Sequence, residues 1–265
     1  MSRCSKRRRG AGPNRRGGFR LGASNAYTPA SDPLTLLWWD PSLLIPGAVS
    51  SWIDRIAGVD AAQGTGTKQP VASSTAIGGA YWGVTSDGGD VLVANAGPVL
   101  SGLTTVTVTV GWFDTEVASP AKMILEYTVN SATANGAFGM FVNDGGGSRF
   151  SGSARGSAGS AIRRCTDAAD VFAVWSVVVD VSLAGNAAVK AVRKNGVAQA
   201  LTSIAATNVA GVLANANLYF FGRGTTPTNP IIGTMGHVVI ANSATEDPAL
   251  LARERYVAAQ GGLTI

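Results

Sequence analysis

The stretch Leu103–Trp112 alternates apolar and polar side chains with a period of two, and this limits the possible folds more than any other feature of the chain. Such alternation indicates a half-buried strand of an antiparallel β-sheet. The face expected in the core consists of Val106, Val108, Val110 and Trp112. The opposite face consists of Thr105, Thr107 and Thr109.

Further strand signals follow along the chain. Val171–Val181 is apolar on both faces except at Ser176 and Asp180, which is typical of a central strand covered on both sides. Asn195-Gly196 lies between two strand-like runs and predicts a type I′ hairpin, because both central residues of that turn need a positive φ. Shorter strands are expected at Ala137–Val142, Leu218–Phe221 and Met235–Ala241.

One helix is expected, close to the C-terminus. Asp247 can cap it, Pro248 suits its first turn, and Gly261-Gly262 would end it. The apolar side chains that would dock it on the edge of the sheets are Leu250, Leu251, Val257 and Ala258. Many short strands, frequent turns and one terminal helix predict an all-β fold, an antiparallel jelly-roll sandwich.

Charge divides the chain into two parts. Residues 1–20 hold eight basic residues and no acid, while the remainder holds 13 basic and 16 acidic residues. Residues 21–33 are small and polar with two prolines, as in a linker. We therefore expect a basic N-terminal arm and linker at 1–33 and a sandwich domain at 34–265. The basic residues of the arm are Arg3, Lys6, Arg7, Arg8, Arg9, Arg15, Arg16 and Arg20.

The arm has almost nothing apolar to bury, so we expect it to be disordered when alone. Three roles remain open: a solvated tail, a contact with nucleic acid through phosphates, or a clip that docks on an acidic groove of a partner protein, where arginine binds carboxylates bidentately. We favour the clip, so the basic residues are expected to anchor the chain to a partner.

The compartment is inferred from what the sequence lacks. The first twenty residues hold no apolar segment of a secretory signal, and no apolar run approaches the roughly 20 residues that cross a bilayer. Cys4 and Cys165 lie in different parts of the chain, so we expect two reduced thiols rather than a disulfide. Synthesis in a host cytoplasm, followed by assembly into a virion released by lysis, fits these observations.

Several motifs in order along the chain give a resemblance. They are WWDPSLLIPGAVSSWID, DAAQGTGTKQPV, IGGAYWGVTSDGGDVL, WSVVVDV, the Lys194-Asn195-Gly196 hairpin and the closing GTMGHVVIANSATEDPALLARERYVAAQ. Over roughly residues 36–262 the chain resembles concanavalin A-like, laminin G-like jelly-roll domains of bacteriophage structural proteins. One departure is His237, which stands where the family commonly has an acid. The fold does not settle function, because lectins, glucanases, adhesion modules and virion parts share it.

Catalytic residues are not expected. A retaining glucanase on this fold needs two carboxylates about 5 Å apart. Asp114 and Glu116 could share a face, but Ser119 stands where the third acid of the motif would be, and Glu126 is isolated in the sequence. We interpret these acids as solvated strand ends. His237, the only histidine, has no nucleophile motif beside it and is expected to be a hydrogen-bonded strand residue.

Neither a metal nor another cofactor is expected. Asn143-Asp144 and Asp87–Asp90 could be calcium loops, but the tight turns beside glycine explain both. Ser148–Ser160 is rich in glycine and serine and reads as a flexible surface loop, or as a contact loop for a neighbour or a glycan.

The aromatic residues divide into core and surface candidates. Trp52, Trp112 and Trp175 are expected in the core, whereas Trp38, Trp39 and Trp82 are left open. In the run 219–221, at least one ring should face outward. The candidate glycan or interface contacts are Asn143, Asp144, Arg149, Arg155 and Tyr219.

These observations favour a bacteriophage virion structural protein without enzymatic activity, a surface-displayed module of the capsid, neck or tail anchored by its arm. The alternative is a glycan-binding adhesin of the particle that contacts the host surface. Expected partners are other virion proteins, further copies of the chain and a host glycan, with nucleic acid less favoured and no membrane.

Overall fold

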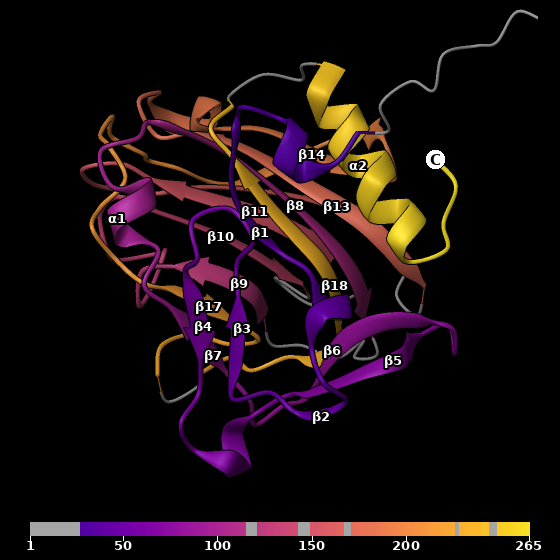
Figure 1. Cartoon of the computed structure of the whole chain (residues 1–265). Coiled ribbons are helices and arrows are strands. Elements are labelled where there is room, and N and C mark those ends of the chain that lie inside the picture. Colours follow the sequence, from indigo (N-terminus) through magenta and orange to yellow (C-terminus); the bar gives the residue numbers. More distant parts are fainter. Residues whose placement is uncertain (1–26, 115–120, 143–148, 167–170, 226–227, 244–247) are drawn as a thin grey trace, which may run out of the picture.

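The computed structural model describes residues 27–114, 121–142, 149–166, 171–225, 228–243 and 248–265. Two antiparallel sheets face each other (Figure 1). Two α-helices, α1 (Gly97–Leu100) and α2 (Pro248–Gln260), and four short 3₁₀ turns join them (Pro29–Ser31, Pro41–Leu43, Gly66–Lys68, Gly185–Ala188). This is the all-β sandwich expected from the sequence. Among the described residues, no helix combines the length and apolarity that crossing a bilayer requires.

Sheet 1 has the strand order β15-β14-β13-β8-β18-β6-β5-β2, and β1 also pairs with β18. Its strands are β1 (Thr35–Trp39), β2 (Gly47–Ala48), β5 (Val71–Ile77), β6 (Tyr81–Asp87), β8 (Thr105–Asp114), β13 (Phe172–Asp180), β14 (Val189–Lys194), β15 (Val197–Ala198) and β18 (Ile232–Ala241).

Sheet 2 has the order β16-β12-β11-β10-β9-β17-β7-β4-β3. Its strands are β3 (Ser51–Ile53), β4 (Asp60–Ala62), β7 (Leu92–Ala94), β9 (Lys122–Tyr127), β10 (Ala137–Val142), β11 (Arg149–Arg155), β12 (Ala161–Thr166), β16 (Thr202–Ala206) and β17 (Leu218–Phe220).

The main core lies between the two sheets. Trp52, Trp112 and Trp175 are buried in it, as expected, and so is Trp39. Phe150 of β11 stacks on Trp175 of β13 with ring centroids 4.0 Å apart, which joins the two sheets face to face. Trp38 packs outside this core in a smaller cluster beneath α2, and Trp82 is half-buried.

Strand β8 differs from its expected half-exposed state. Thr107 and Thr109 are fully buried, because α2 covers the outer face of sheet 1 over β8, β13 and β18 (Figure 1). Thr109 Oγ1 lies 2.9 Å from Ser176 Oγ, so each hydroxyl has a partner in that layer. The helix therefore docks on a sheet face and not on the edge that the sequence suggested. Its expected cap, Asp247, lies outside the described residues.

Two turn and strand predictions can be checked directly. Asn195 and Gly196 have φ of 50° and 81°, which confirms the type I′ hairpin between β14 and β15. The surface loop expected at 148–160 is wrong, because residues 149–155 form the buried strand β11. Its small residues serve close packing: a Cβ on Gly152 would lie 2.7 Å from Val177 Cγ1 of the opposite sheet.

Residues before the predicted domain boundary at residue 34 already pack against the sandwich. Arg253 of α2 is fully buried, and its Nε donates to Asp32 Oδ2 at 2.8 Å. Tyr27 donates to the same oxygen and packs edge-on against Tyr256 of α2. Residues 27–33, which the sequence assigned to the linker, thus lie against the helix. All eight basic residues of the arm lie outside the described residues.

Candidate ligand-binding face

The outer face of sheet 2 carries two rows of side chains set by the strand register. Each strand alternates, so residues beside core positions such as Phe138, Phe150 and Cys165 point outward. The first row runs through Ile162, Ser153, Gly139, Glu126 and Tyr219, which are paired in that order across β12, β11, β10, β9 and β17. The second row runs through Thr202, Arg164, Ser151, Phe141 and Met123.

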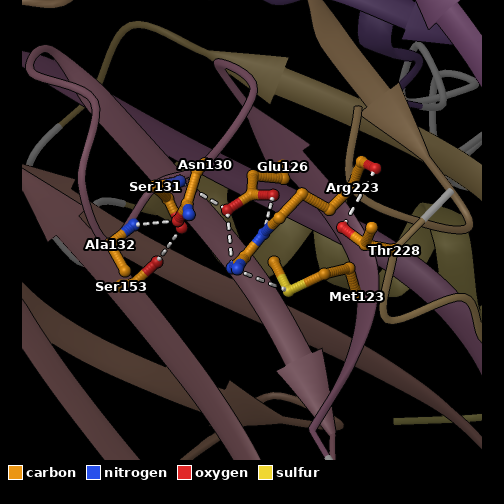
Figure 2. A network of polar contacts seen from close by, with 8 residues as sticks. All are labelled: Met123, Glu126, Asn130, Ser131, Ala132, Ser153, Arg223 and Thr228. Atoms are coloured by element: carbon orange, nitrogen blue, oxygen red, sulfur yellow. Dashed lines mark hydrogen bonds and ion pairs between the residues drawn. The ribbon is translucent and has the colours of Figure 1, made fainter. Parts of the chain in front are cut away.

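A buried ion pair lies at the centre of this face. Arg223 Nε donates to Glu126 Oε2 at 2.7 Å, and Arg223 Nη2 donates to Oε1 at 3.1 Å (Figure 2). The Glu126 side chain is fully buried, and that of Arg223 is 21% exposed. Two hydrogen bonds from one guanidinium to one carboxylate fix the relative orientation of the two groups as well as the distance between them. Glu126, isolated in the sequence, therefore has its partner 97 residues further on.

The loop 128–136 lies over one side of the ion pair. The backbone N–H of Ser131 donates to Glu126 Oε1 at 2.5 Å, and Ser153 Oγ donates to Ser131 Oγ at 3.1 Å (Figure 2). Thr128, where the loop begins, has a φ of 82°, which costs a β-branched residue about 1–3 kcal/mol and persists only where the surroundings hold it. The hydrogen bonds of Ser131 with Glu126 and Ser153 thus hold this loop in position.

The segment that carries Arg223 is fixed by its own backbone. Arg223 and Thr228 exchange two backbone hydrogen bonds of 2.9 and 3.0 Å. Arg223 Nη2 also lies 3.7 Å from Met123 Sδ, on the floor of the face (Figure 2). The guanidinium therefore already contacts Glu126 and Met123 before any ligand arrives.

These elements enclose a hollow of about 180 Å³. Its lining combines apolar and polar side chains, and the lining residues are Ala121, Met123, Ser131, Ala132, Phe141, Ser153, Ile162, Arg223 and Asn229. Pockets for drug-sized ligands span roughly 300–1,000 Å³. This smaller hollow suits one ring-sized group.

The expected contact residues fall in different places. Arg149 begins β11 on the outer face, and Arg155 ends it, where Arg155 Nη1 donates to Ala132 O at 2.9 Å and so supports the loop over the hollow. Tyr219 points to the outer face by its register, as expected of one ring in the run 219–221, but it is only 3% exposed, and Phe220 and Phe221 are fully buried, so none of the three rings is an exposed contact. The strand of Tyr219, β17, lies inside sheet 2 between β7 and β9. Asn143 and Asp144 lie outside the described residues.

Two arrangements can be checked among the described residues: a carboxylate pair on the strands of the outer face, and a cluster of metal ligands. Glu126 is the only acid on β9, β10, β11, β12 and β16, so the carboxylate pair of a retaining glycosidase is not formed on these strands. Asp114 ends β8, and Glu116 lies outside the described residues. Asp87 and Asp90 accept hydrogen bonds from backbone N–H groups of their own turn, and the described residues hold no metal-ligating group of three.

His237 belongs to a buried cluster on the other sheet. Trp38 Nε1 donates to His237 Nδ1 at 3.1 Å, which confirms the expectation of a hydrogen-bonded strand residue. Burial lowers the pKa of His237 from 6.5 to about 4, and the nearby Asp40 offsets this only in part. The imidazole is therefore neutral at pH 7, and its role is to hold β18 and β1 together.

A larger hollow of about 730 Å³ lies between Tyr27, Thr28 and the outward side of α2. Its walls are mostly apolar and include Leu251, Ala252 and Tyr256. Arg255 and Gln260 also line it, but its described lining residues hold no ion pair, whereas Arg223 in the smaller hollow is fixed by a buried one, so the face of sheet 2 is the better candidate site.

No protein-family model matches the chain, and no curated protein matches it. Solved structures do share its fold. Domain 4 of AbnA, an extracellular arabinanase from Geobacillus stearothermophilus solved in complex with arabinotriose, has a TM-score of 0.54 and 16% identity, with 83% of this chain and 97% of that domain covered.

Two further likenesses are of the same kind. The binding domain of botulinum neurotoxin DC, solved in complex with SialylT, has a TM-score of 0.57 at 8% identity over 85% of this chain and 52% of that one. Trypanosoma rangeli sialidase in complex with sialic acid gives 0.56 at 13% identity over 86% of this chain. The chain thus spans about a third of the sialidase and about half of the neurotoxin domain. These likenesses establish the sandwich fold.

Proposed function

We propose that the chain is a glycan-binding module whose ligand occupies the hollow on the outer face of sheet 2. The observation that carries this proposal is the buried Glu126–Arg223 pair, which fixes Arg223 and Ser131 in a lining that also includes Met123 and Phe141. A sugar ring presents apolar C–H groups and hydroxyls together, and a mostly apolar cavity with a few fixed polar groups suits such a ligand.

The ligands of proteins with the same fold support this choice. The arabinanase domain, which the chain covers almost completely, is solved with arabinotriose, and the sialidase with sialic acid. We propose binding without catalysis, because the only acid on strands β9–β12 and β16 is committed to an arginine. The proposed ligand is a glycan of a host surface.

Filling the hollow tests the proposal. Ala132 lines the hollow and is exposed, so Ala132→Trp places an indole there without disturbing the core. The matched control is Ala198→Trp, since Ala198 is exposed on β15 of the other sheet. On a glycan array, the full chain and the A198W variant should bind the same glycans, and the A132W variant should bind none. Equal binding by both variants would place the ligand elsewhere.

A second candidate role, supported by the sequence, is that of a virion structural protein. The basic residues of the arm precede Tyr27, which packs against α2, and we propose that the arm anchors the sandwich to another virion protein, with packaged nucleic acid as the less favoured partner. Deleting residues 1–20 should abolish incorporation into particles, and normal occupancy of the truncated chain would contradict the anchor. Salt-dependent binding of DNA by the arm would indicate the nucleic-acid role.

A further inference from the structure

We propose that the hollow on the outer face of sheet 2 binds the acetamido group of an amino sugar. This inference rests on the proposed function and names the class of its ligand, a neutral glycan that contains an N-acetylhexosamine. An acetamido group has one N–H donor, one carbonyl acceptor and one methyl group, and the hollow offers a matching contact for each of them.

The guanidinium of Arg223 offers a donor for the carbonyl oxygen. Its Nε and Nη2 contact Glu126 and Met123, and no hydrogen bond within the described part of the chain uses Nη1. Nη1 carries two of the five N–H groups of a guanidinium. Because the carboxylate of Glu126 already balances the charge of Arg223, this nitrogen suits a neutral oxygen better than an anion.

The hydroxyl of Ser153 offers an acceptor for the amide N–H. Ser153 Oγ donates its one proton to Ser131 Oγ at 3.1 Å, so toward a ligand this oxygen can only accept. Ser153 is 1% exposed and lines the hollow, and none of the described residues donates a hydrogen bond to its hydroxyl. A buried oxygen of this kind is satisfied best by a ligand that donates to it.

The thioether of Met123 lies between these two polar groups. Met123 Sδ is 3.7 Å from Arg223 Nη2 (Figure 2). A Cβ on Gly139 would lie 3.3 Å from Met123 Cε and 3.0 Å from Ser153 Oγ, so the thioether methyl and this hydroxyl are close neighbours. The N–H and C=O of a trans amide point in opposite directions. An acetamido group whose methyl lies on Met123 therefore directs its N–H to Ser153 and its carbonyl to Arg223.

The lining favours an apolar substituent over the face of a plain sugar ring. Phe141 is the one aromatic residue in the described lining and is 6% exposed, so it offers no open plane on which a ring stacks. The remaining apolar lining is Met123 with Ala121, Ala132 and Ile162. A methyl group gains from burial against such side chains, whereas the hydroxyl of a plain hexose at the same position loses its water.

Matched neutral trisaccharides test the acetamido group, because the charge of the basic arm does not distinguish between them. Tri-N-acetylchitotriose and cellotriose differ only in carrying an acetamido group or a hydroxyl on the second carbon of each ring. Two trisaccharides that end in N-acetylgalactosamine or in galactose form the second pair. Isothermal titration calorimetry of the full chain gives the dissociation constant of each.

The variant is Ser153→Ala, which removes the acceptor, and the control is Ser74→Ala, an exposed serine on β5 of the other sheet. The readout is the ratio of the two dissociation constants within a pair. A general loss of stability weakens both members alike and leaves this ratio unchanged, so the ratio reports the acetamido contact itself.

We expect the acetamido member of at least one pair to bind about tenfold more tightly or better, a difference of about 1.4 kcal/mol. S153A should lower that ratio about threefold or more, as the loss of one hydrogen bond implies, and S74A should keep it. The acetamido site is wrong if both pairs show equal binding, if neither pair binds to a chain that binds other glycans, or if S153A leaves the ratio unchanged. If no glycan of the array binds at all, the proposed function itself fails.

Discussion

Glu126 of β9 and Arg223, 97 residues later, form a two-pronged ion pair with an Nε–Oε2 distance of 2.7 Å beneath the loop 128–136. The pair joins β9 to the segment after β17, and the Ser131 N–H adds the loop to the same carboxylate. Strand β9, the loop 128–136 and the segment after β17 form the candidate site, and all three are therefore held by the buried carboxylate of Glu126.

Removing one member of this pair should destabilise the whole chain. Arg223→Met leaves the fully buried Glu126 carboxylate without its counter-ion, and such a change costs about 3–5 kcal/mol. The double variant E126Q/R223M should recover most of that loss. Urea unfolding measures both, and Arg255→Gln is the control, since Arg255 is exposed on α2 and its substitution should change the free energy of unfolding by no more than about 0.5 kcal/mol. A loss no larger for R223M than for R255Q would contradict the assignment.

The close packing of the two sheets at Gly152 predicts that a larger residue there destabilises the chain. A Cβ on Gly152 would lie 2.7 Å from Val177 Cγ1, so Gly152→Ala should lower the free energy of unfolding by about 1–3 kcal/mol. Gly64→Ala is the control, because nothing lies within 4 Å of that Cβ position. Thermal unfolding compares the two variants, and an equal effect would mean that the sheets are further apart than described.

The N-terminal segment predicts a contrast between two truncations. Deleting residues 1–26 should leave the free energy of unfolding unchanged. Deleting residues 1–33 also removes Asp32, the partner of the fully buried Arg253, and should cost several kcal/mol by the same loss of a counter-ion. Circular dichroism melts of both truncations test this. Equal stability would show that residues 27–33 add nothing to the fold.

His237 predicts how stability depends on pH. Its pKa in the folded chain is about 4, below the ordinary 6.5, so the unfolded chain binds the extra proton first as the pH falls. Its stabilising contribution is complete above pH 6.5 and is lost between about pH 6.5 and 4, amounting to about 3 kcal/mol in all. Because His237 is the only histidine, an NMR titration of its ring protons reads the pKa directly. A folded-state pKa near 6.5 would contradict the buried cluster.

Much of the fold could be predicted because it depends on local patterns. A few neighbouring residues are enough to indicate the strand β13, from its apolar run, and the turn at Asn195-Gly196. The proline and glycines at the two ends of α2 indicate its bounds in the same way. Whether the outer side chains of a strand are buried depends on the elements that pack over them. The period-two alternation of apolar and polar residues does not show this. The threonines of β8 are polar yet buried because a helix from the other end of the chain lies over them.

The candidate site was harder to predict for the same reason. Arg149 was singled out and does lie on the outer face, but Glu126 appeared isolated, and Arg223 had no signal at all. Their pairing requires β17 to lie beside β9, a contact across roughly ninety residues. A buried acid flanked by apolar residues, as in KMILEY, is the one local signal that could have indicated a distant arginine.

The central claim is that a glycan binds in the hollow on the outer face of sheet 2. The most direct measurement is NMR mapping of backbone amide shifts in the full chain during titration with a glycan that the array identifies. We predict that the largest shifts fall at Ser131, Ala132, Ser153 and Ile162, while α2 stays unchanged. Shifts confined to the groove between Tyr27 and α2, with none at these four residues, would contradict the claim.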